Sequence, residues 1–260
     1  MLAGGQLPSA PRAATLVIIA TYNESENLRP LMARILAVAP VDVLVIDDSS
    51  PDGTGDMAGE IARREPRLTV LHRPVKSGVA SAHVLGVRYA EEHGYQLVVE
   101  MDADFSHPPE DLPRLIEACR GVDVAIGSRN VTGGRVVGRS WWRNALTGLG
   151  CAYARAVLRL PVRDCTGGYR CTRTSAWKVI DLNLLQSRGY GFQLELNRAW
   201  ARGGMRFAEL PIVFRDRVSG ASKMSASILF EALWVVLRLR LGLIPSALKS
   251  SRERWPSSVR

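Results

Sequence analysis

Short apolar runs that stop abruptly at polar or acidic residues recur along the first half of the chain, and they constrain the fold more than any other feature. Such runs extend from Thr15 to Ala20, from Val41 to Ile46 and from Leu97 to Met101. Continuous apolar runs of this length, rich in β-branched residues, are typical of strands buried on both faces of a sheet. Segments with helical periodicity separate them, so the chain predicts a doubly wound, mostly parallel α/β sheet.

The remaining elements follow from the same patterns. In the first half we expect helices at 25–38, 54–64, 77–93 and 110–118, and further strands at 68–71 and 122–127. Gly94 suits the left-handed position that closes a helix. In the second half we expect helices at 140–160, 192–202 and 225–243, a strand at 205–214 with Pro211 on a sheet edge, and a glycine-containing loop at 164–170. No repeat or linker divides the chain.

Acidic and polar side chains directly follow three of the predicted strands. Tyr22 and Glu24 follow the first, Asp47 and Asp48 the second, and Asp102-Ala103-Asp104 the fourth. Open α/β sheets bind ligands at the carboxyl ends of their strands, and Mg²⁺ is usually held by one or two carboxylates together with substrate phosphates. The alternative for Asp102 and Asp104 is a cap that favours the dipole of the next helix. Three acidic strand ends favour a nucleotide with its cation.

Charge is divided unevenly between the two halves of the chain. Residues 1–128 hold 11 Lys and Arg against 18 Asp and Glu, a formal charge of −7, and residues 129–260 hold 23 against 7, a charge of +16. No basic-aromatic interleaving accompanies the basic half, so we expect no nucleic acid partner. The basic half suits phosphates or an anionic membrane surface, and a solvated basic surface is the alternative.

The cysteines and the first residues bear on the compartment. Four cysteines form no CxxC pair and have no histidine at zinc-ligand spacing, which indicates reduced thiols in a cytoplasmic protein. The first twelve residues lack the apolar core of a signal peptide, and we expect a flexible tail over residues 1–13. The GxGxxG fingerprint follows none of the strands, which argues against a dehydrogenase of the Rossmann type.

Six motifs, taken in order, carry a resemblance to a known family. They are Thr21-Tyr-Asn-Glu24, Asp47-Asp-Ser-Ser-Pro-Asp-Gly-Thr54, Asp102-Ala-Asp104, Gly127-Ser-Arg129, Asp164-Cys-Thr-Gly-Gly-Tyr-Arg170 and Phe214-Arg-Asp-Arg-Val-Ser-Gly-Ala-Ser-Lys223. Together they resemble the polyprenol (dolichol) phosphate mannose synthases of the inverting GT-A glycosyltransferase family 2. The resemblance implies a single Rossmann-like GT-A catalytic domain over residues 14–225, with helices on both faces of its sheet. An amphipathic helix and basic tail over residues 226–260 would follow.

The resemblance implies a donor site for GDP-mannose. Its nucleotide-sugar contacts would be Ala20, Tyr22, Glu24, Ile46, Asp48, Asp102, Ala103, Asp104, Arg217 and Lys223. The cation, Mg²⁺ or Mn²⁺, would bind Asp104 directly, with Asp102 nearer the nucleotide. Ser106 stands where relatives often offer glutamine, so its metal contact would run through water. A solvated basic turn is the alternative for the loop of Arg217 and Lys223.

The resemblance also implies an acceptor site for a polyprenyl phosphate at Arg129, Arg143 and Thr147, and arginine's planar fork suits phosphate. The residues acting in catalysis would be Asp104, Arg129 and Arg217. We expect Asp164, Arg170 and Glu195 to support the site, although relatives often have serine where Gly167 stands. For Trp141 and Trp142 we expect core packing, with a lipid interface as the alternative.

The implied reaction is inverting transfer of mannose from GDP-mannose to a polyprenyl phosphate, giving a polyprenyl β-mannosyl phosphate. A phosphate monoester with a second pKa of about 6 is largely ionised at neutral pH, so it needs positioning more than a strong base. Two alternatives stay open. One is a polyprenyl-phosphate glycosyltransferase that uses a UDP-hexose. The other is a basic, non-catalytic protein that binds anionic lipid or nucleic acid, which would not explain the acidic strand ends.

Residues 227–248 are the candidate membrane-contacting segment. A spanning helix needs about 20 apolar residues with few charges, but Glu231, Arg238 and Arg240 interrupt this run and Pro245 ends it. We therefore predict an interfacial helix and peripheral association with the cytoplasmic side of the membrane. A helix packed on the catalytic domain is the alternative. Relatives without their own spans commonly associate with an integral-membrane partner protein, and the resemblance allows one here.

Overall fold

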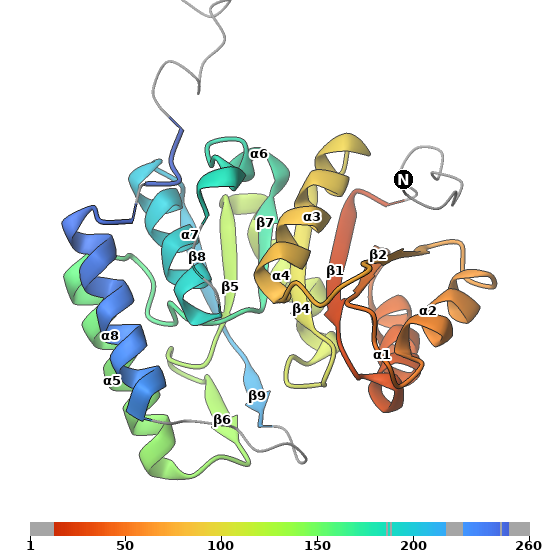
Figure 1. The fold of residues 1–260 in the computed structure, drawn as a ribbon, viewed down its shortest axis with the longest axis horizontal. Helices are drawn as coiled ribbons and strands as arrows, with labels where there is room; N and C mark the ends of the chain where they lie inside the picture. The colour runs from red at the N-terminus through yellow and green to blue at the C-terminus, as the bar shows by residue number, and fades with distance from the viewer. Residues whose placement is uncertain (1–12, 186, 188, 217–225, 245, 250–260) are drawn as a thin grey trace, which may run out of the picture.

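A seven-stranded sheet crosses the middle of the molecule, with helices on both of its faces (Figure 1). The computed structural model describes residues 13–185, 187, 189–216, 226–244 and 246–249, and of residues 226–232 it describes the backbone alone. In spatial order the strands are β3 (Leu68–His72), β2 (Asp42–Asp47), β1 (Thr15–Thr21), β4 (Leu97–Asp102), β7 (Arg170–Arg173), β5 (Val124–Ser128) and β8 (Phe207–Pro211). All run parallel except β7, which is antiparallel to both β4 and β5. The prediction of a mostly parallel sheet is confirmed.

Alternating apolar side chains place helices on both faces of the sheet. On β1, Leu16 and Ile18 join one buried cluster, and Val17 and Ile19 join the other, because successive strand side chains point to opposite faces. The first face is covered by α3 (Val79–Glu92), α5 (Trp141–Leu158), α6 (Thr174–Trp177), α7 (Tyr190–Arg202) and α8 (Ala226–Leu241). The second is covered by α1 (Ser25–Val38), α2 (Thr54–Ala62) and α4 (Leu112–Gly121).

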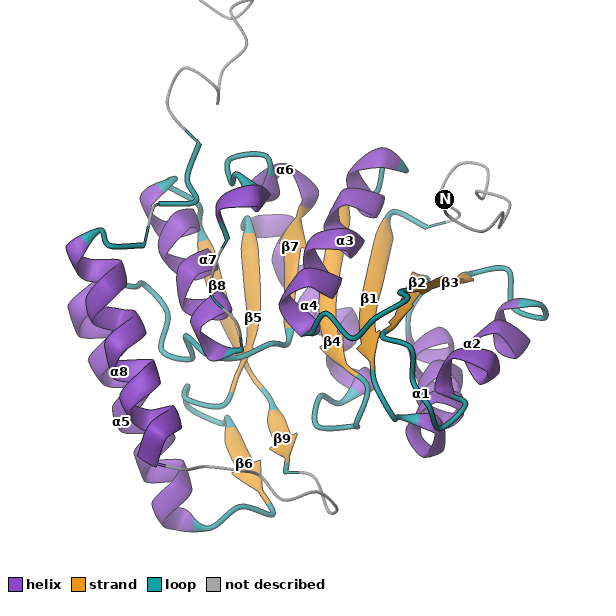
Figure 2. Cartoon of the chain, viewed as in Figure 1, coloured by secondary structure: helices purple, strands orange, loops and turns teal. Residues whose placement is uncertain are grey.

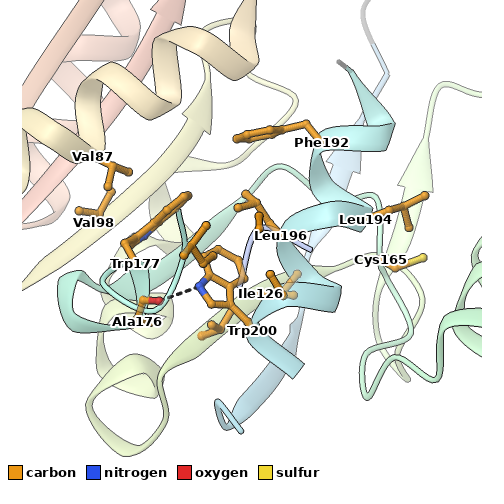
Figure 3. Packing of buried hydrophobic residues seen from close by; sticks show 14 of the residues in the cluster. Val87, Val98, Ile126, Cys165, Ala176, Trp177, Phe192, Leu194, Leu196 and Trp200 are labelled. Atoms are coloured by element: carbon orange, nitrogen blue, oxygen red, sulfur yellow. Dashed lines mark hydrogen bonds between the residues drawn. The ribbon is translucent and has the colours of Figure 1, made fainter. Parts of the chain in front are cut away.

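Two tryptophans anchor the core beside β7 (Figure 3). The rings of Trp177 and Trp200 meet edge to face, with centroids 4.9 Å apart and an angle of 84° between planes. Each buried indole N–H has a partner, since Trp177 donates to the Thr172 hydroxyl at 2.7 Å and Trp200 to the Ala176 carbonyl at 3.0 Å. Because both polar ends are satisfied, the rings add apolar contact without a desolvation cost.

The second half of the chain departs from prediction at three strands. The strand expected at 205–214 is broken at Ile212 into β8 and β9 (Val213–Arg215). β9 leaves the main sheet and pairs in parallel with β6 (Arg135–Val137), a strand that the sequence pattern did not indicate (Figure 2). β7 begins at Arg170, the last residue of the predicted loop at 164–170, and no strand was predicted there. Pro211 does lie on an edge strand, as expected, because β8 is the last strand of the sheet.

Some helix starts also differ from prediction. α3 begins at Val79 rather than at residue 77, because Gly78 adopts a φ of 86° that lies outside the helical region. α2 begins at Thr54, as expected, and Gly53 in the left-handed conformation precedes it. α4 is preceded by a short 3₁₀ turn, η1 (Pro109–Asp111), and a second turn, η2 (Leu182–Leu184), follows α6. Gly94 closes α3 with a φ of 76°, as expected.

The C-terminal helix α8 packs against the domain. It contacts α5 and α7, and Val236 and Leu239 are buried there. Within the described part of the chain, no helix combines the length and apolar character that crossing a membrane requires. The expected flexible tail falls, except for Ala13, outside the described residues, as does the basic tail from residue 250 onward.

Candidate functional site

The carboxyl ends of β1, β2 and β4 meet in register at one edge of the sheet. Ala20 on β1 is paired with Ile46 on β2 and with Asp102 on β4. Ala103 follows directly and is buried. Four of the predicted nucleotide-sugar residues therefore form one continuous row. Two of them, Ile46 and Asp102, are 56 positions apart in the sequence.

Tyr22 and Glu24 lie just beyond the end of β1, next to this row. The Tyr22 ring is partly exposed and lies beneath Lys76, whose Nζ is 3.4 Å from the ring centroid. Glu24 stands at the start of α1, where its backbone N–H donates to the Thr54 hydroxyl at 2.9 Å. Sequence reasoning did not single out Lys76, because one lysine in a loop carries no pattern. Here it places a cation beside a residue predicted to contact the nucleoside.

Asp48 is buried and holds the loop that carries Lys76. Its carboxylate pairs with Arg73 and accepts the backbone N–H groups of Ser77 at 3.1 Å and Gly78 at 2.9 Å. The neighbouring Asp47 accepts the Thr21 hydroxyl at 3.1 Å. The structure thus gives Asp48 a role in shaping the rim of the site, and its predicted contact with the nucleoside remains a prediction.

A tight turn after β4 carries the predicted metal ligands. Asp104 accepts the backbone N–H of Ser106 at 3.0 Å, and Phe105 between them has a φ of 61°, which a bulky residue seldom adopts. The Asp102 side chain is 38% exposed, whereas Ser106 is buried. Strain of this kind persists where surrounding contacts fix the backbone, and it clusters at functional sites.

These oxygen atoms suit a hard divalent cation. Among the described residues, the buried Ser106 hydroxyl has no hydrogen-bond partner, so it is available as a ligand beside two carboxylates or to a bound water. No group of three His, Cys, Asp or Glu side chains gathers as a metal cage within the same residues. A site with two carboxylates that relies on phosphates and water for its other ligands is the usual arrangement for Mg²⁺.

His107 closes the turn and was not assigned a role from sequence. Its ring is buried, and its Nδ1 accepts the backbone N–H of Asp102 at 3.1 Å. Burial lowers the pKa of His107 below its usual value, although Asp102 and Asp104 act in the opposite direction. The ring stacks on Tyr169, with centroids 4.9 Å apart.

Arg129 lies at the end of β5, with Asp164 as its partner. The side chain of Arg129 donates to Asp164 through Nε at 2.8 Å and Nη2 at 2.6 Å, and Nη2 also reaches the Thr166 hydroxyl at 3.0 Å. Burial would raise the pKa of Asp164, but the hydrogen bonds and charge of Arg129 hold it below its usual value. The expectation that Asp164 supports the site agrees with this geometry.

One face of α5 is directed toward Arg129. Cys151 lies 3.5 Å from the hydroxyl of Thr166, which itself accepts from Arg129. Thr147 and Arg143 precede Cys151 by one and two turns, and residues four apart share a helix face. The predicted acceptor residues Arg143 and Thr147 therefore share the face of α5 that carries Cys151, whose neighbour Thr166 contacts Arg129. The Thr147 hydroxyl donates within the helix, to the Arg143 carbonyl at 2.9 Å.

Phe214 on β9 joins the two sides of the site. The guanidinium carbons of Arg129 and Arg139 lie 5.2 Å and 5.8 Å from its ring centroid, within cation–π range. Arg139 forms an ion pair with Asp216, with Nε 3.1 Å from Oδ2. The chain then enters residues 217–225, so the predicted donor residues Arg217 and Lys223 lie outside the described residues.

A buried charge network lies behind the row. Glu100 on β4 is fully buried between His83, whose Nδ1 is 2.5 Å from Oε1, and Arg170, whose Nε is 3.1 Å from Oε2. Burial would raise the pKa of Glu100, but the charges of His83 and Arg170 lower it overall. Arg170 also donates to the Gly167 carbonyl at 2.7 Å. Glu195, expected in support, is buried and accepts the Ser187 N–H at 3.0 Å.

The two tryptophans at the start of α5 are exposed, so the expectation of core packing is wrong. Trp141 is 80% and Trp142 52% exposed, because the first turn of α5 extends beyond the sheet edge, beside β6 (Figure 1). The guanidinium carbon of Arg143 is 6.0 Å from the Trp142 ring centroid.

Comparison with models of protein families identifies the family of this chain. The family model described as glycosyl transferase family 2 matches residues 16–180, which hold the strand ends of β1, β2 and β4, the turn after β4, and Arg129 with Asp164. The chain belongs to glycosyl transferase family 2. The predicted family and the GT-A type of fold are therefore confirmed.

Three relatives of this glycosyltransferase are named as enzymes that transfer mannose to a polyprenyl or dolichyl phosphate, or that make the product of that transfer. It is 46% identical to an undecaprenyl-phosphate mannosyltransferase of Micrococcus luteus, over 88% of this chain and 99% of that one. It is 44% identical to a polyprenol monophosphomannose synthase of Mycolicibacterium smegmatis, over 87% and 86%. A dolichol-phosphate mannosyltransferase of Pyrococcus furiosus is 35% identical, over 86% of this chain and 62% of its own.

Solved structures agree on the fold. A glucosyl-3-phosphoglycerate synthase of Mycobacterium tuberculosis, in complex with Mn²⁺, UDP-glucose and phosphoglyceric acid, superposes with a TM-score of 0.65 at 17% identity, over 91% of this chain and 81% of that one. A mannosyltransferase of Pyrobaculum calidifontis, in complex with GDP-Man and Mn²⁺, gives 0.56 at 18% identity, over 94% and 67%.

Proposed function

We propose that this glycosyltransferase transfers mannose from GDP-mannose to a polyprenyl phosphate, with inversion, to give a polyprenyl β-mannosyl phosphate. The row of Ala20, Ile46 and Asp102 across three strand ends carries the proposal, because it aligns main-chain and carboxylate groups for one nucleotide. The names of the relatives from Micrococcus luteus and Mycolicibacterium smegmatis support a polyprenyl phosphate acceptor and mannose as the sugar.

The donor half of the site is acidic. We assign the nucleoside to Tyr22, Glu24 and Asp48, with Ala20 and Ile46 as main-chain contacts, and the nucleotide end of the cation site to Asp102 with Ala103. Asp104, Asp102 and the hydroxyl of Ser106 would hold Mg²⁺ or Mn²⁺. When bound, such a cation neutralises charge on the diphosphate leaving group. Arg217 and Lys223 are assigned to the same diphosphate, which they would stabilise as it departs.

The acceptor half is basic. Arg129 and Arg143, with the hydroxyl of Thr147, would orient the acceptor phosphate and neutralise part of its charge. Asp164 fixes the guanidinium of Arg129 through two hydrogen bonds. A phosphate oxygen then attacks C1 of mannose as the bond from C1 to GDP breaks, and GDP leaves with the electron pair. Because the dianionic phosphate is already a nucleophile, these residues position it rather than deprotonate it.

The decisive experiment measures sugar transfer to a short polyprenyl phosphate. Radiolabelled GDP-mannose and UDP-glucose are compared as donors, each with and without EDTA. We expect labelled lipid from GDP-mannose alone, and its loss in EDTA and in Asp104→Ala. Asp56→Asn, on the exposed surface of α2, is the matched control and should retain full activity. Labelling from UDP-glucose would overturn the donor, and near-normal turnover of Asp104→Ala would overturn the cation site.

We further propose that the enzyme is peripheral on the cytoplasmic face of the membrane. Trp141 and Trp142 on α5, and Trp234 and Leu241 on α8, are more than half exposed, and the half of the chain that holds them is basic. Tryptophan and arginine together favour the headgroup region of an anionic bilayer. An integral-membrane partner protein would cover the same residues.

Co-sedimentation with anionic lipid vesicles tests this placement. We expect the double variant Trp141→Ser/Trp142→Ser to bind vesicles less well than the parent, while its transfer to a short, water-soluble polyprenyl phosphate stays within about twofold. The exposed Val75→Ser, on the donor side, is the control. Unchanged vesicle binding by the double variant would exclude these tryptophans as a membrane contact.

A further inference from the structure

His107 has no part in the mechanism above, yet it is built into the turn that carries the cation ligands. Its side chain is 2% exposed. It reaches back along the turn, so that Nδ1 accepts the backbone N–H of Asp102 at 3.1 Å. The Asp102 carboxylate itself lies 3.7 Å from the same nitrogen. The His107 side chain therefore holds the backbone of Asp102 in place through this hydrogen bond.

This hydrogen bond specifies one form of the ring. A nitrogen that accepts a backbone N–H carries no hydrogen, so the imidazole is neutral with its hydrogen on Nε2. An apolar residue of similar size would fill the space but leave the Asp102 N–H without its acceptor, and a buried or half-buried donor without a partner is costly. The feature of His107 that matters here is therefore the ability of Nδ1 to accept a hydrogen bond.

Aromatic rings fix the imidazole on two sides. Tyr169 stacks on it with an angle of 14° between planes, and the Tyr169 hydroxyl donates to the Pro108 carbonyl at 3.0 Å. Phe214 meets it edge-on, with centroids 5.6 Å apart. The next residue of β9, Arg215, donates its N–H to the Ser106 carbonyl at 3.3 Å. The turn is thus held at 106, 107 and 108 by β9 and by the segment before β7.

We propose that His107 is a positioning residue for the cation site: its unprotonated Nδ1 fixes the backbone of Asp102 and so sets the carboxylates of this turn for a divalent cation. The inference rests on the proposed function, whose cation site it deepens. Groups that orient metal ligands typically change metal affinity about 10- to 100-fold when they are removed. Phe214 contacts both His107 and Arg129, so the same ring ties the cation turn to the acceptor arginine.

The test compares two amide variants in the full-length protein. Asn places its carbonyl oxygen where Nδ1 stands, whereas the longer Gln places it near Nε2, out of reach of the Asp102 N–H. Binding of Mn²⁺ in the presence of GDP is followed by the electron paramagnetic resonance signal of the free ion, without turnover. We expect His107→Gln to weaken Mn²⁺ binding at least about tenfold and His107→Asn to remain within about threefold of the parent. Equal affinity in both variants would overturn the inference.

Mn²⁺ binding by the parent protein separates the failure of the proposed function from the failure of this inference. If the parent binds no Mn²⁺, the cation site itself is wrong and the inference falls with it; if the parent binds and the Gln variant binds equally well, only the inference falls. Should both variants fail to fold, the nitrogen-15 spectrum of the parent's imidazoles decides. His107, assigned through its Overhauser contacts with the Tyr169 ring, must carry its hydrogen on Nε2, and a hydrogen on Nδ1 would overturn the inference.

Discussion

Asp164 accepts two hydrogen bonds from the side chain of Arg129, from Nε at 2.8 Å and from Nη2 at 2.6 Å, and a third from the Arg129 backbone N–H at 2.8 Å. The Asp164 side chain is fully buried and that of Arg129 is 8% exposed. The arginine that follows β5 is therefore fixed at both its backbone and its guanidinium. This makes the pair a determinant of stability and, in the proposed function, of acceptor binding as well.

Asp164→Ala should lower the free energy of unfolding by about 3–5 kcal/mol, because it leaves the Arg129 charge buried without its partner. Urea unfolding followed by circular dichroism measures the loss. Glu60→Ala removes an ion pair with Arg29 whose side chains are more than half exposed, and it should change the same quantity by less than about 0.5 kcal/mol. Similar losses in the two variants would contradict the buried pairing.

Asp52 should make stability fall in acid. It accepts the N–H groups of Ser25 at 3.1 Å and Thr54 at 3.0 Å, which begin α1 and α2. Slight burial raises the pKa of Asp52, but the hydrogen bonds from Thr54 and Ser25 dominate and lower it to about 2. Since the unfolded value is about 3.9, the stabilisation is complete above that pH and is lost as the pH falls toward about 2.

The measurement for Asp52 compares urea midpoints of the parent and Asp52→Asn from neutral pH down to the lowest pH at which both remain folded. We expect the parent's advantage to be constant above a pH of about 5 and to shrink below about 4. A difference that stays constant through this range would show that the charge of Asp52 does not stabilise the two helix starts.

Gly86→Ala should destabilise the protein, because the added Cβ would lie 2.6 Å from Cδ1 of Ile18, on the strand beneath α3. Overpacking of this kind costs about 1–3 kcal/mol. Gly59→Ala on α2 is the matched control: a Cβ there meets nothing within 4 Å, and alanine should stabilise the helix by about 0.5–1 kcal/mol. Melting temperatures that move in the same direction would contradict this account.

Gly134→Ala should impair catalysis by displacing the end of β5. A Cβ on Gly134 would lie 2.4 Å from the Ser128 carbonyl oxygen and 2.9 Å from the Arg129 carbonyl carbon. Because the proposed acceptor site depends on Arg129, we expect transfer to fall roughly tenfold or more. Gly150→Ala on α5, where a Cβ meets nothing within 4 Å, should retain the parent's rate. Equal rates for both variants would show that this turn does not position Arg129.

The parallel core was predictable because its strands are apolar on both faces and end in turn residues. β7 was not, since Arg170 and Thr172 make its sequence look like a surface segment. The charge of buried Arg170 is balanced by Glu100, which is 70 residues earlier and opposite it on β4. A partner so distant in sequence leaves no local pattern, and the same holds for β6, whose three residues pair with β9.

The site was predictable to a similar extent. The carboxylates of β1, β2 and β4 are signalled by their place after apolar runs, and register brings Ala20, Ile46 and Asp102 together as expected. The positions of Lys76 over Tyr22 and of His107 against Asp102 depend on how loops fold back, which no periodicity encodes. The exposure of Trp141 could not be read from composition, because a tryptophan favours a core and an interface alike.

The place of β7 in the sheet means that the sheet cannot be completed before the second half of the chain is present. β7 lies between β4 and β5 and runs against both, although it is made after them on the ribosome. Until residues 170–173 emerge, β4 and β5 each expose an unpaired edge, and such edges promote association between chains. Closing the sheet then depends on contacts between distant parts of the sequence, which slows folding. The basic second half of the chain thus supplies the strand that joins β4 to β5, both of which belong to the acidic first half.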